Sequence, residues 1–300
     1  MQENNCKYVC SRGILKSCDI HSNQPISSIR ELVSYDFSNC KNGSTIYICS
    51  SAIKYFISYI CKNIPYKIIL VTGDCDETCW EDIFSKYEDF LYFIENDKII
   101  HWFSQNCTTI HPKLTQIPIG LDYHTMSNHH PTWGPKLKPL EQEQILQKII
   151  TSQSFKLYCD RELRCYSNFH FSVKTKYGND RIDAYNKIPK HLIYYEPSHV
   201  LRETSWNNQT KYCFVISPHG NGLDCHRTWE ALLLGCIPIV KTSNLDTLYI
   251  DLPVLIVQQW SDISENLLKN TIYEFKNKQL NYNRLLLSYW VNLINIKKLE

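Results

Sequence analysis

The chain has 300 residues, of which 43% are hydrophobic, and a formal net charge of +2. Its hydrophobic content is enough for two packed cores and excludes a largely disordered chain, while the balanced charge gives no indication of a nucleic-acid partner. No run approaches the roughly 18 consecutive apolar residues of a membrane-spanning helix, and the N-terminus lacks the apolar segment of a signal peptide.

The first half of the chain alternates predicted strands with predicted helices. The strands are expected at 45–49, 66–72, 98–104 and 114–119, and the helices at 51–61 and 80–90. This alternation indicates a parallel sheet between helices, with ligands collecting at the carboxyl ends of its strands. Asp74 follows the second of these strands, and Asp122 and His124 follow the fourth.

The second half repeats the α/β pattern after a predicted linker. The linker is 127–139 and leads into a helix at 140–151, and a hinge is expected between that helix and Phe169. Further elements are predicted as strands at 169–172 and 253–257 and as helices starting at 178, 263 and 282. We therefore predict an α/β fold of two Rossmann-like lobes, residues 1–150 and 151–300.

The most informative run is residues 213–240, CFVISPHGNGLDCHRTWEALLLGCIPIV. It predicts a buried strand, a turn, a helix that Asp224 caps and Gly235 ends, and a second buried strand. The turn consists of His219, Gly220, Asn221 and Gly222. We expect positive φ at its glycines, and an anion site where backbone N–H groups and the helix dipole point at a phosphate or diphosphate.

Arg227 and Glu230 stand three residues apart, so the predicted helix projects them from one face. The Arg227 guanidinium suits phosphate oxygens, and Glu230, one turn further on, suits two ribose hydroxyls. An anion cradle followed by a diol acceptor describes a nucleotide site; the alternative is an Arg–Glu pair on a solvated helix face. His219 is assigned to the site, whereas His226 at the helix start is expected to cap or pack.

The segment resembles the donor-binding core of exostosin-like glycosyltransferases, which have the two-lobed GT-B fold. The match to their motif R-x-x-E-A-L-x-x-x-C-x-P is carried by Arg227, Glu230, Ala231, Leu232, Cys236 and Pro238. One departure concerns the spaced glutamates of many retaining GT-B enzymes, because Gly222 stands eight residues before Glu230. This departure favours inversion of the anomeric centre while leaving retention open.

The resemblance implies a glycosyltransferase. The second lobe would hold a UDP- or GDP-sugar as co-substrate, and the first lobe a glycan or glycoprotein acceptor. Lys174 and Arg181 would face the diphosphate, unless they are ordinary surface cations. No metal ion or other cofactor is expected, because a helix dipole and basic side chains commonly steady the leaving group in such enzymes. The apolar helix at 282–296 would cross back onto the first lobe.

An inverting transferase needs a base that takes the proton of the acceptor hydroxyl. We expect this base to come from the first lobe, where Asp74 and Asp122 are the candidates and His124 is a third. Each carboxylate has an alternative explanation as a turn or capping residue.

Two other functions stay open. The chain could be a non-catalytic module that binds a glycan or a nucleotide sugar, since the base is not assigned. It could also be a dinucleotide-dependent oxidoreductase, with G-x-G-x-x-C at 220–225 and Asp246 as a partial fingerprint. That second assignment leaves Arg227 and Glu230 without a role.

The fourteen cysteines lack the C-x-x-C spacings of zinc sites, so no metal site is predicted. Their number in a chain without a secretion signal indicates reduced thiols, and we expect a cytoplasmic protein.

Overall fold

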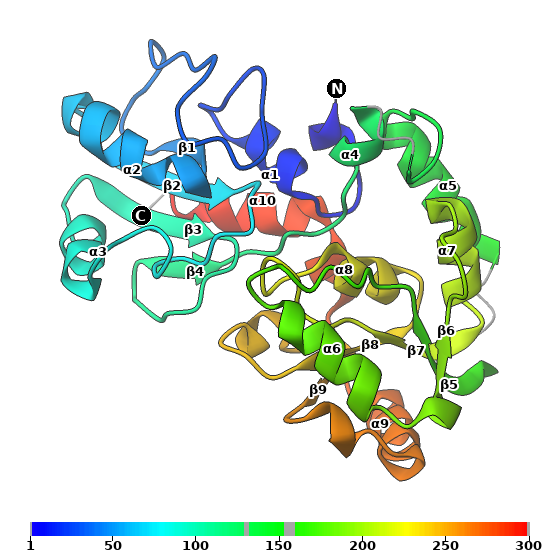
Figure 1. Ribbon diagram of the computed structural model, residues 1–300. Helices are drawn as coiled ribbons and strands as arrows, with labels where there is room; N and C mark the ends of the chain where they lie inside the picture. The colour runs from blue at the N-terminus through cyan, green and yellow to red at the C-terminus, as the bar shows by residue number, and fades with distance from the viewer. Residues whose placement is uncertain (1, 129–131, 153–159, 299–300) are drawn as a thin grey trace.

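The computed structural model describes residues 2–128, 132–152 and 160–298, and this chain folds into two α/β lobes (Figure 1). Each lobe contains one parallel sheet, with strand order β1-β2-β3-β4 in the first and β6-β5-β7-β8-β9 in the second. The predicted class, two Rossmann-like lobes of GT-B type, is confirmed by this pair of parallel sheets.

The first sheet is built from four strands, β1 (Ser44–Cys49), β2 (Ile68–Gly73), β3 (Ile99–Ser104) and β4 (Leu114–Gln116). Side chains alternate along these strands, as the two-residue period of a strand requires. Leu70 and Trp102 enter a core beneath α2 (Ile53–Tyr55) and α3 (Tyr87–Ile94), whereas Val71 and Phe103 enter the core on the opposite face.

The second sheet consists of β5 (Glu162–Ser167), β6 (Ile193–Tyr195), β7 (Tyr212–Ile216), β8 (Ile237–Lys241) and β9 (Leu255–Val257). Its helices are α6 (Gly178–Lys187), α7 (Arg202–Gln209), α8 (His226–Leu233) and α9 (Glu265–Asn277). The chain leaves β5 toward β6 and returns to β7 on the other side of β5. This reversal makes the carboxyl ends of β5 and β7 the expected ligand position.

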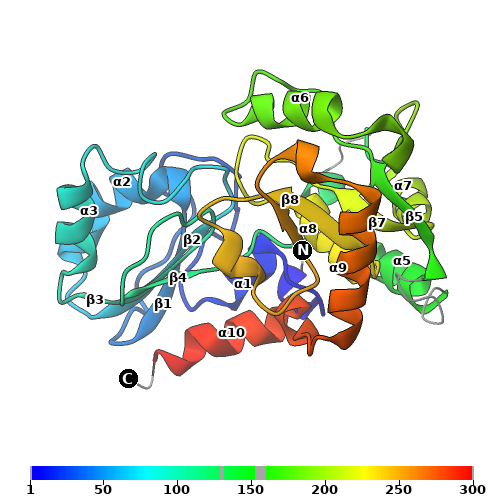
Figure 2. The ribbon, with the colours of Figure 1, turned by 90° about the horizontal axis from the view of Figure 1, so that it is seen from below.

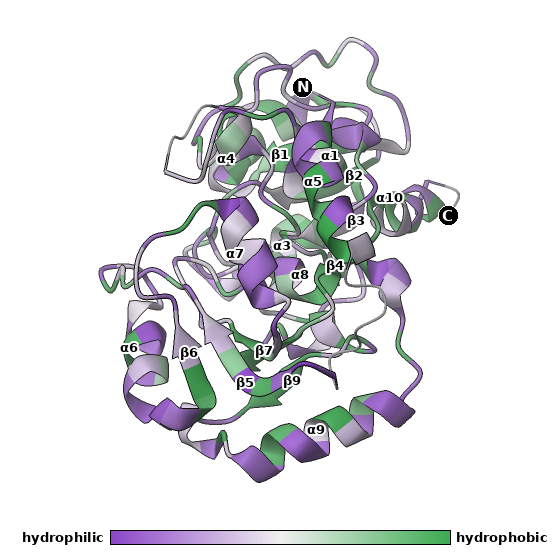
Figure 3. Ribbon diagram, turned by 90° about the vertical axis from the view of Figure 1, so that its right-hand side faces the viewer, coloured by the Kyte–Doolittle hydropathy of each residue, from purple (hydrophilic) through white to green (hydrophobic). Residues whose placement is uncertain are grey.

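Helix α9 covers the outside of the second lobe. Figure 3 shows hydrophobic and hydrophilic residues alternating along it, and its buried positions are Leu268, Thr271 and Phe275. Helix α5 (Pro139–Ser152) packs instead on α7, near the junction of the lobes, and α4 (His124–Ser127) precedes it. Every cysteine among the described residues carries a free thiol.

The C-terminal segment joins the two lobes. It forms a 3-10 turn at Tyr282–Leu285, becomes extended at Leu286, and continues as α10 (Leu287–Ile296), so the predicted single helix is interrupted. The Leu287 N–H donates to the carbonyl of Lys7 at 2.9 Å, and the Val9 N–H donates to the carbonyl of Leu285 at 3.0 Å. Helix α10 packs against α1 (Ser11–Ser17), and Figure 2 shows it running from the second lobe along the first.

Several predicted elements differ from the structure. The strand predicted at 169–172 is wrong, because β5 ends at Ser167. Residues 80–86 form turns, so the helix predicted at 80–90 begins at Tyr87. The helix predicted at 51–61 is a series of short 3-10, α and π turns. The predicted linker and hinge lie partly outside the described residues.

Replacing Trp290 by alanine tests the packing of α10. Trp290 is 2% exposed, its Nε1–H donates to the carbonyl of Arg284 at 2.8 Å, and its ring lies in the core shared by both lobes. We expect Trp290→Ala to lower the free energy of unfolding by about 3–5 kcal/mol, measured by urea denaturation. Tyr273→Ala on α9, where the side chain is 74% exposed, is the control and should change stability by less than about 0.5 kcal/mol. Equal effects of the two variants would contradict this packing.

Candidate functional site

A cavity of about 600 Å³ opens between the lobes, at the carboxyl ends of β5, β6 and β7. The first lobe contributes Asp76, Ile119 and Asp122 to its lining, and the second lobe contributes most of the rest. This position coincides with the reversal of strand order in the second sheet, where open α/β folds bind their ligands. The volume suits a ligand of nucleotide size.

The loop after β7 and the start of α8 form one wall of the cavity. The lining residues from this region are Gly220, Asn221, Gly222, Asp224, Cys225, His226, Arg227 and Glu230. Helix α8 begins at His226 and its N-cap is Cys225, so the predicted cap at Asp224 is wrong. Gly235 ends the helix with a φ of +72°, as predicted. Because the first amides of a helix have no intrahelical acceptor, this N-terminus offers donors to an anion.

The two glycines of the loop allow other side chains to approach its backbone closely. Neither Gly220 nor Gly222 has a positive φ, so that expectation is wrong. A Cβ on Gly220 would lie 2.4 Å from Nη2 of Arg181, and a Cβ on Gly222 would lie 3.0 Å from Nδ2 of Asn106. The absence of a side chain therefore lets Arg181 and Asn106 reach the loop.

Two arginines of the cavity form no ion pair with a carboxylate of the described residues. Arg181 donates from Nη1 to the carbonyl of His170 at 2.9 Å, and Arg227 donates from Nε to Oδ1 of Asn168 at 3.3 Å. Among the described residues, no ion pair within 4.0 Å forms between either guanidinium and a carboxylate. Burial lowers the pKa of Arg227, and the positive charge of Arg181 acts in the same direction. An anion between the two groups would relieve this repulsion.

Glu230 and Asp122 share a third arginine. Arg202, from α7, places Nε 3.8 Å from Oε1 of Glu230 and Nη2 3.3 Å from Oδ2 of Asp122. It also donates to the carbonyl of Asp122 and, at 3.3 Å, to Oε1 of Gln142. Arg202 therefore ties the first lobe to α8 and pairs with two of the carboxylates in the cavity wall, Asp122 and Glu230.

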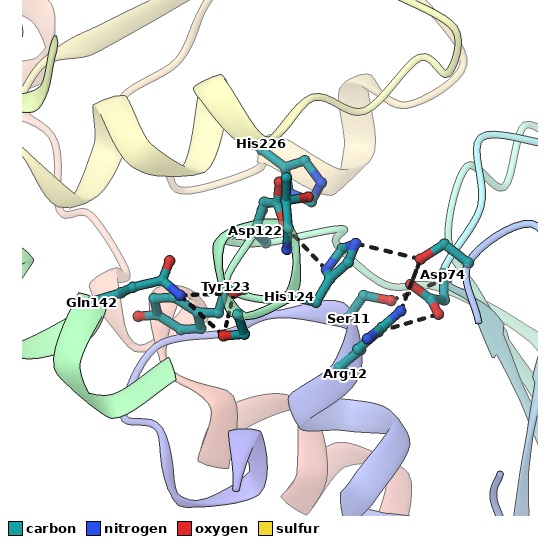
Figure 4. Close-up of polar contacts among 12 residues, drawn as sticks. Ser11, Arg12, Asp74, Asp122, Tyr123, His124, Gln142 and His226 are labelled. Atoms are coloured by element: carbon teal, nitrogen blue, oxygen red, sulfur yellow. Dashed lines mark hydrogen bonds and ion pairs between the residues drawn. The ribbon is translucent and has the colours of Figure 1, made fainter. Parts of the chain in front are cut away.

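Asp122 also forms a pair with His124. Nδ1 of His124 lies 3.1 Å from Oδ1 of Asp122, and Figure 4 shows His124 between Asp122 and Asp74. Burial alone would raise the pKa of Asp122, but the charges of His124, His226 and Arg202 outweigh burial and lower it. Burial lowers the pKa of His124. Asp122 is thus held as a carboxylate, which makes it a weak proton acceptor.

Asp74 lies apart from the cavity. Its carboxylate is buried, accepts from the hydroxyl of Ser27 at 2.8 Å, and lies 3.5 Å from Nε of Arg12. It does not belong to the cavity lining. The two predicted carboxylates are therefore separated by the structure, and only Asp122 reaches the cleft.

Three other residues predicted for the site are Asp224, His219 and Lys174. Asp224 is buried, which raises its pKa, and its carboxylate accepts from the Ile119 N–H at 2.8 Å and from Nε1–H of Trp229 at 2.9 Å. His219 packs beside Asp180, and the backbone N–H of His219 donates to the Asp180 carboxylate at 2.9 Å. His219 and the exposed Lys174 are outside the cavity lining.

Asp246 also lies away from the cavity. Its carboxylate accepts from the hydroxyl of Thr242 at 2.6 Å and from the N–H of Ser243 at 2.9 Å. A dinucleotide-binding site requires this carboxylate at the ligand, but here it is hydrogen-bonded within its own turn.

Sequence reasoning missed the wall of the cavity formed after β5 and β6. This wall includes Ser167, Asn168, Phe171, Tyr195 and Glu196. The hydroxyls of Ser167 and Tyr195 are buried without a hydrogen-bond partner among the described residues. A buried hydroxyl without a hydrogen bond costs free energy, which makes these two groups uncommon among buried side chains. The one available signal was the polar run at the end of β5, which the strand predicted at 169–172 obscured.

Neither a protein-family model nor a curated protein sequence matches this chain. A solved α1,3-fucosyltransferase is similar in structure, with a TM-score of 0.41 and 11% sequence identity over 91% of this chain and 94% of that chain. None of the described helices has the length and apolar character needed to cross a membrane.

Replacing Arg202 by alanine tests the charge pairing of the cavity wall. The change leaves the carboxylates of Asp122 and Glu230 largely buried without their partner, since these side chains are 12% and 13% exposed. We expect the free energy of unfolding to fall by about 3–5 kcal/mol. Lys187→Ala removes an exposed helical pair with Asp183 and should cost less than about 0.5 kcal/mol. An Arg202→Ala variant as stable as this control would contradict the bridging role.

The low pKa of Asp122 predicts a pH dependence. Because its folded pKa lies below the unfolded value of about 4, Asp122 stabilises the fold above that pH, and the contribution is lost as the pH falls below it. Asp122→Asn should therefore be less stable than the wild type at neutral pH, and the difference should shrink in acid. Urea denaturation at a series of pH values measures this; a difference that grows in acid would show the opposite shift.

Proposed function

We propose that this protein is a glycosyltransferase that moves a sugar from a nucleoside-diphosphate sugar to a hydroxyl of a glycan or glycoprotein. The observation that carries the proposal is the pair of arginines, Arg181 and Arg227, which line the cavity without an acidic partner among the described residues. A diphosphate has the charge and the oxygens that two guanidinium groups and a helix N-terminus recognise.

The lining supports an assignment for each part of the donor. The diphosphate is assigned to Arg181, Arg227 and the N-terminus of α8, and the ribose hydroxyls to Glu230. The aromatic rings of Phe171 and Tyr195 line the same cavity. These rings are assigned to the apolar faces of the nucleobase.

Catalysis would come mainly from stabilising the leaving group. When the bond between the anomeric carbon and the phosphate breaks, negative charge develops on the diphosphate. Arg227 and the start of α8 line the cavity, and in this proposal they stabilise that charge. The exostosin-like motif, the UDP or GDP nucleotide and inversion at the anomeric carbon remain parts of this proposal.

A panel of UDP- and GDP-sugars tests the proposal. Purified protein is expected to hydrolyse one of these donors slowly and to transfer its sugar to a suitable glycan acceptor. Binding of a nucleoside diphosphate without transfer or hydrolysis would favour the non-catalytic binding module. Absence of both binding and transfer across the panel would contradict the proposed function.

Replacing Glu230 should mainly change nucleotide binding, whereas replacing Arg227 should mainly change kcat. A ribose contact is the same in the ground state and the transition state, so Glu230→Ala should weaken binding by about 1.5–3 kcal/mol and change kcat little. Arg227→Ala should mainly lower kcat, because charge on the leaving group develops in the transition state. Calorimetry and steady-state kinetics measure both effects.

The control for this pair is Lys269→Ala, which removes an exposed helical ion pair with Glu265 and should leave both quantities unchanged. Equal and small effects of the Glu230 and Arg227 variants would indicate that these side chains only pack on the helix.

Sugar transfer is also expected to survive EDTA. Arginine side chains and a helix dipole would supply the positive charge that a divalent ion supplies in other transferases. The measurement is the transfer rate before and after chelation. Loss of transfer in EDTA and its recovery with Mn²⁺ or Mg²⁺ would contradict this leaving-group chemistry.

A further inference from the structure

We propose that His226 is the general base that takes the proton of the acceptor hydroxyl. This inference rests on the proposed function and assigns the base that the sequence left open. His226 is the first residue of α8 and lines the cavity next to Arg227. Figure 4 shows its side chain beside Asp122, at the junction of the two lobes.

The contact of His226 with the first lobe sets its tautomer. Nδ1 lies 2.7 Å from the carbonyl oxygen of Gly120. A carbonyl oxygen can only accept a hydrogen bond, so Nδ1 carries the proton in the neutral ring. The lone pair is then on Nε2, which is the form a general base requires.

The carbonyl that orients the ring is itself fixed. Gly120 has a φ of +65°, and a Cβ at this position would lie 2.2 Å from the carbonyl oxygen of Val9. The next residue, Leu121, donates its N–H to that same Val9 carbonyl at 2.8 Å. Because the N–H groups of Ile119 and Leu121 are both hydrogen-bonded, the backbone is held on both sides of Gly120 and the imidazole is positioned before any ligand binds.

The neighbouring groups favour His226 over the carboxylates. Asp122 is paired with Arg202 and His124, so its lone pairs are engaged, and Asp74 lies outside the cavity lining. The side chain of Asp122 lies beside His226, so the proposed base has a carboxylate next to it (Figure 4).

The reaction forms one bond, breaks another and moves one proton. The acceptor oxygen attacks the anomeric carbon and forms the new glycosidic bond, while its hydroxyl proton moves to Nε2 of His226. The bond from the anomeric carbon to the phosphate oxygen breaks with its electron pair. The nucleoside diphosphate leaves, and Arg181 and Arg227 stabilise its added charge.

Two substitutions of His226 test the assignment. His226→Ala removes the base, and His226→Gln keeps a polar side chain of similar length without one. Both are expected to lower kcat for sugar transfer by roughly 10²–10⁴-fold, with affinity for UDP or GDP within about threefold of the wild type. Added imidazole should restore part of the activity of His226→Ala. His191 is exposed, so the control variant His191→Ala should transfer sugar at the wild-type rate.

The outcomes separate this assignment from the function itself. Transfer by both His226 variants at near the wild-type rate would overturn the base and leave the transferase intact. Loss of UDP or GDP binding along with transfer in both would show a structural role and would also overturn it. A wild type that binds no nucleoside diphosphate and transfers no sugar would contradict the proposed function, and the base with it.

Discussion

The cleft depends on one short segment of the first lobe, Ile119–Asp122. The Ile119 N–H donates to the buried carboxylate of Asp224, the Gly120 carbonyl accepts from the ring of His226, and the Asp122 carboxylate pairs with Arg202. Three polar contacts from four residues therefore hold three groups of the second lobe. Because one of these groups is the first residue of α8, the same segment that joins the lobes also fixes the start of the helix that faces the cavity.

Charge in the cavity is distributed unevenly, and the proposed binding of an anion depends on this distribution. Arg202 neutralises both Asp122 and Glu230, whereas Arg181 and Arg227 have no carboxylate within 4.0 Å among the described residues. Two like charges in a partly buried space destabilise the empty cavity, and an anionic ligand removes that cost. Burial is the main cause of the lowered pKa of Arg227, and the positive charge of Arg181 acts in the same direction.

The sequence was sufficient where local pattern decides the structure. The apolar runs of the first sheet and the run at 213–240 gave strands and a helix at nearly their observed positions, because hydrophobic periodicity determines both. It was insufficient where tertiary contacts decide. Asp224 resembles a cap locally but bonds to a backbone amide 105 residues away, and His226 is oriented by a carbonyl 106 residues away. The strand β5 was missed because it begins with the exposed Glu162 and includes the half-buried Arg164.

A structure determined with bound UDP or GDP tests the central claim most directly. The diphosphate is predicted to lie between the guanidinium groups of Arg181 and Arg227, at the N-terminus of α8, with the ribose hydroxyls hydrogen-bonded to Glu230. A nucleoside diphosphate bound elsewhere on the molecule, or a cavity that stays empty at saturating ligand, would contradict the account.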